Sequence, residues 1–200
     1  MILPECRPLW DGVDGADSVV FNPHKWLGAV FDCSLFFVRD TEHLIRVMST
    51  SPSYLQTAAD GRVKNYRDWG IALGRRFRAL KLWCLIRAEG VDGLRARLRR
   101  DIRNAKWLAE LVSATPGWRV VAPVPIQTVC VVHEPPGLGG DELDAHTRRW
   151  ADAVNRSGRA YLTPAVLGGR WVVRVSVGSL TTERSDVEAV WAAMRGAAEA

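Results

Sequence analysis

Apolar and polar positions alternate along the chain with periods that predict short strands and amphipathic helices. In the first half, compact apolar runs predict a buried strand at 18–21 and a second strand at 33–38. Apolar side chains at helical spacing predict helices at 41–48, 73–89 and 92–114. Residues 50–66 form a polar stretch, and a loop of this length in a compact domain is often a functional lid.

The second half of the chain predicts a small α/β sandwich. Strands are predicted at 118–121, 128–133, 160–163 and 171–177, and helices at 141–154 and 182–194. Strands and helices that alternate in this way pack as layers around one core. Thr41 and Thr182 are the predicted N-caps of their helices, because a threonine hydroxyl accepts hydrogen bonds from free N–H groups of the first turn.

Length and composition are those of an ordinary globular protein. The 200 residues allow one domain or two small ones, and 48% hydrophobic residues are enough to bury a core. The formal net charge is +5, but the basic residues are mostly arginines spread along the chain rather than gathered in a patch. We therefore expect no nucleic-acid partner, and an Arg-rich module that binds acidic partners is the non-enzymatic alternative.

Cysteine spacing and the apolar runs argue against a metal site and a membrane span. The four cysteines are far apart and form no CxxC pair, and we expect Cys33, Cys84 and Cys130 to be buried, reduced thiols. The histidines other than His24 have no partner at ligand spacing, so no metal is expected. No signal-peptide h-region and no run of about 18 apolar residues occurs, which predicts a cytoplasmic protein without a membrane span.

The segment from Asn22 to Trp26 is the most informative one for function. A short apolar strand ends at the turn signal Asn22-Pro23, and His24 and Lys25 follow at once. A partly apolar setting favours the neutral form of a lysine amine, which can form a Schiff base with an aldehyde. A surface lysine in a turn is the alternative, and these five residues taken alone favour it.

Further motifs follow this segment in order along the chain. Phe31–Ser34 reads FDCS, Ser53–Leu55 reads SYL, and Tyr66–Lys81 reads YRDWGIALGRRFRALK. Together with NPHKW at 22–26 and the strand at Trp171–Arg174, these blocks resemble the group II pyridoxal-phosphate (PLP) dependent decarboxylases, most of all the aromatic L-amino-acid decarboxylases. The resemblance covers essentially the whole chain, and several ordered blocks make chance a poor explanation.

The resemblance implies roles for individual residues. Lys25 would be the Schiff-base lysine that binds PLP, with Asn22 and His24 beside the cofactor and its phosphate. Tyr54 would return a proton to the substrate carbon after CO₂ leaves, and the loop at 50–66 would close over the site. The resemblance implies decarboxylation of an L-amino acid, an aromatic one by the closest match, to an amine and CO₂.

The same resemblance implies the fold and the partners. We expect an α/β fold of the PLP-dependent transferase-like class (fold type I) in truncated form. Residues 1–80 would be the C-terminal part of the large PLP-binding domain, and residues 81–200 the small C-terminal α/β domain. Leu73 and Gly74 match positions that approach the neighbouring subunit's site in the family dimer, so a homodimer is expected.

Two cofactor contacts of the family cannot be placed in this sequence. The family pairs the pyridine nitrogen of PLP with an Asp that precedes the point matching residue 1, and it stacks an upstream His on the ring. Asp11, Asp14 and Asp17 show no reason to replace that Asp. The chain is then completed by an N-terminal polypeptide, or it is an inactive remnant. A PLP enzyme of another type, such as an aminotransferase or desulfurase, is a third interpretation, which Tyr54 and the Leu-Gly-Arg-Arg match disfavour.

Overall fold

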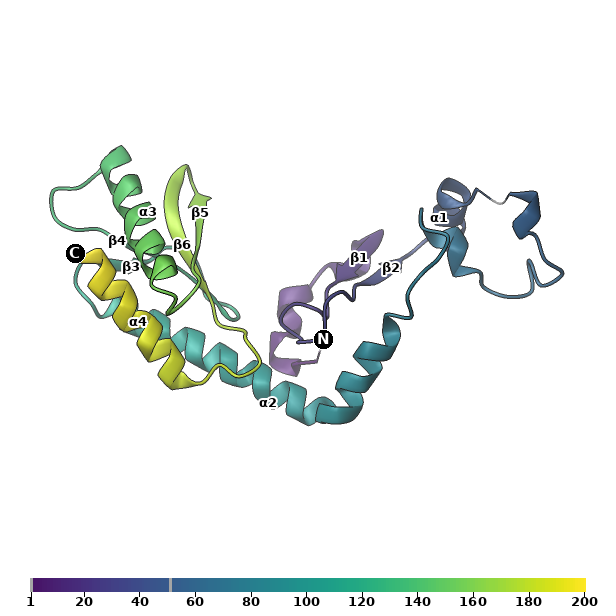
Figure 1. Cartoon of the computed structure of the whole chain (residues 1–200), viewed down its shortest axis with the longest axis horizontal. Coiled ribbons are helices and arrows are strands. Elements are labelled where there is room, and N and C mark those ends of the chain that lie inside the picture. Colours follow the sequence, from purple (N-terminus) through teal and green to yellow (C-terminus); the bar gives the residue numbers. More distant parts are fainter. Residues whose placement is uncertain (1, 51) are drawn as a thin grey trace. The chain divides into compact units, whose positions relative to one another are not determined.

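The chain divides into two compact units after residue 92 (Figure 1). The computed structural model describes residues 2–50 and 52–200. The first unit holds a two-stranded antiparallel sheet and short helices, and the second holds a four-stranded sheet with longer helices. No helix in the described ranges is long and apolar enough to span a bilayer. A domain boundary between residues 80 and 81 stays a prediction.

The first unit is built from short elements. They are the 3-10 helices Pro4–Trp10, Val13–Gly15, Ser53–Leu55 (η3) and Tyr66–Trp69 (η4), the strands β1 (Ser18–Phe21) and β2 (Leu35–Val38), and the helix α1 (Thr41–Met48). β1 pairs with β2 in a register that places Ser18 opposite Val38. The strand at 18–21 is therefore confirmed, but its predicted burial is wrong, because Val20 is 59% exposed. The second strand begins at Leu35 rather than at residue 33.

Helix ends differ from the predictions where a stronger cap lies nearby. Asp40, not Thr41, is the N-cap of α1, and its carboxylate accepts a hydrogen bond from the N–H of His43 at 2.8 Å. Helix α2 (Ala79–Ser113) starts later than the predicted residue 73. The predicted break near residue 90 is confirmed, because Gly90, with a φ of 68° that glycine adopts easily, is non-helical and separates two helical segments at a kink.

The second unit is an antiparallel sheet in the strand order β3-β4-β6-β5. Its elements are β3 (Trp118–Val120), β4 (Thr128–His133), α3 (Gly140–Arg156), β5 (Thr163–Leu167), β6 (Arg170–Ser176) and α4 (Arg184–Ala198). Gly168 and Gly169, both at positive φ, form the tight turn between β5 and β6. The strand predicted at 160–163 thus lies further along the chain. A capping box of Glu183 and Asp186 begins α4, so the predicted Thr182 cap is wrong.

One hydrophobic core holds the second unit together. The strands contribute valines such as Val131 and Val173, and the helices contribute Leu108, Trp150 and Trp191, all buried. Each fully buried aliphatic or aromatic side chain stabilises the fold by about 1.5–3 kcal/mol. Apolar burial on this scale lets the second unit form its own core.

The four cysteines are free thiols in different environments. Cys6 and Cys33 are buried, Cys130 is half-buried and Cys84 is exposed on α2. The expectation of burial is thus confirmed for Cys33 and wrong for Cys84. Within the described ranges, no group of three or more His, Cys, Asp or Glu side chains is arranged to hold a metal ion.

A histidine pair lies against the aromatic part of the core. His133 on β4 and His146 on α3 are both buried, and Nδ1 of the first lies 2.9 Å from Nε2 of the second. The His133 ring also lies 4.8 Å from the Trp118 ring. Burial lowers the pKa of both imidazoles, and Arg149 lowers that of His146 further, whereas Glu199 acts in the opposite direction on the pKa of His133. One ring nitrogen must accept the hydrogen bond, so two protonated rings cannot keep it.

We expect the second unit to lose stability as the pH falls through the histidine range. Because both folded-state pKa values lie below the ordinary value of about 6.5, the unfolded chain binds more protons there. The stabilisation is complete above about pH 6.5 and declines below it. Urea unfolding followed by tryptophan fluorescence should show a lower midpoint at about pH 5.5 than at about pH 7.5. The double variant His133→Gln/His146→Gln should reduce this difference between the two urea midpoints. If the difference stayed the same, the histidine pair would not be its cause.

Candidate functional site

The turn after β1, residues 22–29 (the Lys25 turn), is closed by backbone hydrogen bonds that keep Lys25 in place. The N–H of Lys25 donates to Asn22 O at 3.0 Å, and the N–H of Gly28 donates to Lys25 O at 2.9 Å. The N–H of Ala29 donates to Pro23 O at 2.9 Å. The Lys25 side chain is exposed, and no residue in the described ranges pairs with its ammonium group. Its amine is therefore accessible to a small aldehyde.

His24 is held against the segment that leads into β2. Its Nδ1 lies 2.7 Å from Cys33 O and 3.1 Å from Cys33 N, and a given tautomer can form only one of these hydrogen bonds. The shorter distance favours a protonated Nδ1 that donates to Cys33 O. The Phe31 ring meets the imidazole edge to face, with the centroids 5.0 Å apart. This arrangement leaves Nε2 of His24 for a ligand.

Asn22 is oriented by a single short hydrogen bond. Ser34 Oγ donates to Asn22 Oδ1 at 2.6 Å. This bond uses an acceptor site of the amide and leaves both N–H donors of Nδ2 for an anionic oxygen. The structure thus brings Asn22, His24 and Lys25 together in one turn, while their contacts with a cofactor stay predictions.

The other predicted site residues lie elsewhere in the first unit. Tyr54 lies in η3 with its side chain exposed. Leu73 and Gly74 are exposed in the segment that leads into α2. Among residues 2–50 and 52–200, no hydrogen bond or ring contact joins Tyr54 to Lys25. The structure therefore does not bring these residues together with the Lys25 turn, and their roles stay predictions.

Sequence reasoning missed the side chains that tie residues 31–33, which follow the Lys25 turn, to the start of α2 and the residue before it. Arg78 Nε donates to Asp32 Oδ2 at 3.0 Å, and this hydrogen bond lowers the pKa of Asp32. The Cys33 thiol lies 3.6 Å from Arg78 O, and Lys81 Nζ donates to Phe31 O at 3.3 Å. Asp32 and Arg78 both belong to motif blocks, but a single sequence does not show which distant charges pair.

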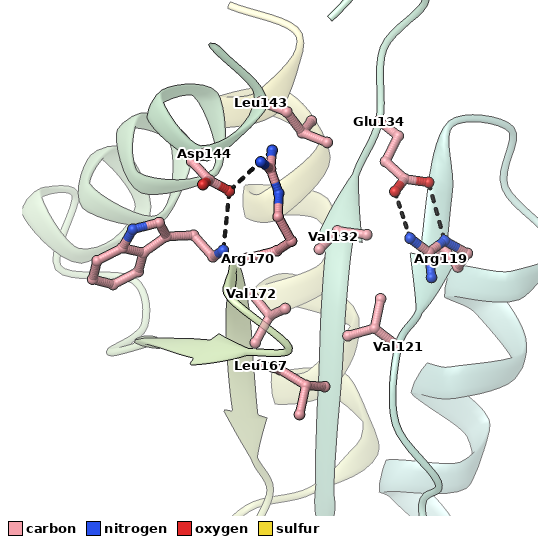
Figure 2. A pocket seen from close by; sticks show the side chains of 10 residues that line it. Arg119, Val121, Val132, Glu134, Leu143, Asp144, Leu167, Arg170 and Val172 are labelled. Carbon is pink, nitrogen blue, oxygen red and sulfur yellow. Dashed lines mark hydrogen bonds and ion pairs between the residues drawn. The ribbon is translucent and has the colours of Figure 1, made fainter. Parts of the chain in front are cut away.

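The second unit has a separate surface hollow of about 240 Å³ (Figure 2). Apolar side chains on the sheet and just after β3 line it, namely Val121, Val132, Leu167 and Val172. Two ion pairs flank these side chains, Arg119 with Glu134 at 2.5 Å and Arg170 with Asp144 at 3.5 Å. Because these charges already face opposite charges and no predicted site residue lines the hollow, it is not the candidate site.

Comparison with known proteins identifies the relatives of the chain. The model of the pyridoxal-dependent decarboxylase conserved domain matches residues 1–133. Tyrosine decarboxylase 1 from Narcissus pseudonarcissus is 41% identical over an alignment that covers 97% of this chain and 39% of that protein.

Solved structures agree with this result. Oryza sativa TDC, solved with PLP and tryptamine, superposes with a TM-score of 0.91 at 35% identity, over 98% of this chain and 41% of that one. The 4-hydroxyphenylacetaldehyde synthase of Rhodiola rosea gives a TM-score of 0.83 at 34% identity, over 98% of this chain and 40% of that one.

The chain spans about 40% of the length of the proteins it matches. The prediction of an α/β fold of the PLP-dependent transferase-like class, present in part, is confirmed by these superpositions. The family model matches well over half of the chain. The chain belongs to the pyridoxal-dependent decarboxylase family.

Proposed function

We propose that this chain carries the cofactor lysine of an enzyme that decarboxylates an aromatic L-amino acid to an amine and CO₂. The Lys25 turn carries the proposal, because its amine is exposed and its backbone is closed by hydrogen bonds. Membership of a pyridoxal-dependent family supports this role. The names of the similar proteins, a tyrosine decarboxylase and a TDC solved with tryptamine, favour an aromatic substrate.

The residues of the turn fit the polar groups of PLP. Lys25 offers an amine for the aldehyde, Asn22 two amide N–H donors and His24 one imidazole nitrogen. When bound, PLP supplies a conjugated ring that takes up the electrons of the breaking bond. The family pairs the ring nitrogen of PLP with a carboxylate, and no residue of this sequence matches that position. We propose that another part of the family fold supplies that carboxylate.

Tyr54 is the residue we propose for the final proton transfer. After CO₂ leaves, the substrate carbon must gain a proton to give the amine, and a phenol placed there can donate one. Tyr54 is exposed in the structure, so its hydroxyl would reach the site when the loop at 50–66, of which residue 51 lies outside the described residues, closes over it. The closed loop would also exclude water from the reacting carbon.

The first unit exposes an apolar surface that further polypeptide would cover. Among its described residues, the buried apolar side chains are Leu3, Cys6, Ala29 and Cys33. Large exposed apolar side chains occur on the β1–β2 sheet and near the start of α2, including Val20, Phe36, Phe37, Phe77, Leu80 and Trp83. Exposed apolar surface of this kind marks protein contacts. We propose that N-terminal polypeptide of the family fold and a second subunit, which Leu73 and Gly74 would approach, cover it.

Product analysis separates this proposal from a PLP enzyme of another reaction type and shows whether the chain acts without further polypeptide. One similar structure is named as a synthase of an aldehyde, so related chains differ in the product they are named for. An amine with an equal amount of CO₂ supports decarboxylation, and an aldehyde would identify the other reaction type. Product formation only after an N-terminal polypeptide is added would identify a chain that requires a partner.

Reductive trapping tests the role of Lys25 directly, because the chain has only four lysines, Lys25, Lys64, Lys81 and Lys106. The chain is incubated with PLP, reduced with borohydride, digested and mapped by mass spectrometry. We expect Lys25 to carry at least about tenfold more adduct than Lys106, an exposed lysine of the second unit. Equal labelling of the four lysines would overturn the proposal.

A further inference from the structure

The loop that carries Tyr54 is organised around one arginine. Arg67 lies in η4, and its side chain is only 19% exposed. One terminal nitrogen donates to Leu55 O, and the other donates to Asp60 Oδ2 at 3.0 Å. Its Nε lies 3.5 Å from Asp68 Oδ1. The planar guanidinium thus joins the beginning, the middle and the end of the loop.

Asp60 is the second centre of this network. Its carboxylate accepts hydrogen bonds from the N–H and the hydroxyl of Thr57, both at 3.1 Å, and from Asn65 Nδ2 at 2.9 Å. The Thr57 N–H above all, with the Thr57 hydroxyl and Arg67, holds the pKa of Asp60 below its ordinary value. A carboxylate with so many donors is a fixed anchor for the surrounding backbone.

Tyr54 depends on this network because its own side chain is not held. The side chain is 78% exposed, and no side chain in the described ranges contacts it by a hydrogen bond or a ring interaction. Its backbone turn is closed by the N–H of Leu55 donating to Pro52 O at 3.0 Å and that of Gln56 donating to Ser53 O at 3.2 Å. The Arg67 hydrogen bond to Leu55 O anchors the residue next to Tyr54.

We propose that Arg67 and Asp60 are positioning residues that hold the 53–55 turn and thereby set the place of the Tyr54 hydroxyl. The inference rests on the function proposed above for Tyr54. The network is also anchored to a helix, because Ser49 Oγ at the end of α1 donates to Asp68 Oδ1 at 3.1 Å. An ordinary surface ion pair contributes little, but Arg67 is largely buried and has several acceptors.

Hydrogen exchange measured by mass spectrometry on the full chain tests whether the network holds the turn. In Arg67→Met, the segment 52–69 should exchange about tenfold faster than in the wild-type chain. Asp60→Asn should have an effect in the same direction. Arg62→Met is the matched control, since Arg62 lies in the same loop and its guanidinium donates, among the described residues, only to Ala58 O, so its effect should stay within about twofold. Arg67→Lys should be better protected than Arg67→Met, because lysine keeps the positive charge but lacks the two terminal nitrogens of the guanidinium.

A fluorine signal tests whether the network also sets the place of Tyr54. The chain has three tyrosines, so labelling with 3-fluorotyrosine gives three signals, and Tyr54→Phe assigns one of them. In Arg67→Met, the Tyr54 signal should narrow as the residue moves more freely, whereas the Tyr161 signal in the second unit should not change.

The two measurements test the positioning role of Arg67 and Asp60 independently of the role of Lys25, since neither measurement needs PLP. Faster exchange together with a narrower Tyr54 signal supports it. Equal exchange in Arg67→Met and the wild type, or exchange in the wild type at the rate of an unfolded peptide, would overturn it. An unchanged Tyr54 signal beside faster exchange would also overturn it, because Arg67 would then only stabilise the loop. Failure of trapping at Lys25 would instead remove the proposed function.

Discussion

Replacing Lys25 with alanine should abolish the covalent attachment of PLP and lower the rate of amine formation at least about 10³-fold. Asn22 and His24 can bind polar groups of the cofactor, but neither has a primary amine that could react with the aldehyde. The Lys25 amine is exposed and unpaired within the described ranges, so its removal leaves the backbone of the turn unchanged. Visible absorbance of the holoenzyme reports the attachment, and chromatography of the amine reports the rate.

Two further variants separate chemistry from charge. Lys25→Arg keeps a positive charge but cannot react with the aldehyde, so it should behave like Lys25→Ala. Lys106→Ala removes an exposed lysine of the second unit and should leave both readouts unchanged. If Lys25→Ala kept its covalent PLP, the cofactor lysine would be one of the other three, and the motif at 22–26 would have been misread.

Much of the local structure follows from the sequence, because each element is set by its own side chains. The helices at 41–48 and 141–154 were predictable from apolar spacing alone, and the structure has them as α1 and α3. The caps were not. Asp40 and Glu183 compete with the neighbouring threonines for the same N–H groups, and local sequence does not decide that competition.

Burial was harder to predict than secondary structure, because it depends on what lies across from a residue. The apolar run at 18–21 is typical of a buried strand, yet among the described residues β1 pairs only with β2, and Val20 is exposed. Contacts between distant residues of the second unit were equally hard to predict. His133 and His146 have no signature in sequence, but the fold joins them by a hydrogen bond between β4 and α3.

In the candidate site, too, some features were predictable from the sequence and others were not. Asn22, His24 and Lys25 are adjacent in sequence, so the motif predicted their place in one turn. The side chains that hold the site elements in place, Arg78 and Arg67, act across the sequence on Asp32 and Leu55. No period or spacing encodes such pairs, and only the folded backbone brings them together.

Replacing Trp150 with alanine should lower the free energy of unfolding of the second unit by about 3–5 kcal/mol. Trp150 lies on α3, is 1% exposed, and packs against Trp118 with the ring centroids 5.3 Å apart. Its loss leaves a cavity in the centre of the core, and a small domain has only about 5–15 kcal/mol in total. Urea unfolding followed by circular dichroism measures the change. Trp83→Ala, at a position 59% exposed on α2, should change the same free energy by less than about 0.5 kcal/mol.

Trp150→Phe shows how much of this effect comes from packing alone. The indole Nε1 is buried and has no hydrogen-bond partner within the described ranges, so phenylalanine loses volume but no hydrogen bond. We expect a loss of about 1–2 kcal/mol, less than half of the alanine effect. Trp150→Ala should also leave hydrogen exchange of residues 52–69 unchanged, because the core of the second unit lies after residue 92. If both units lost protection together, they would unfold as one cooperative structure. A selective loss would instead mean that the second unit folds around its own tryptophans, independently of the first unit.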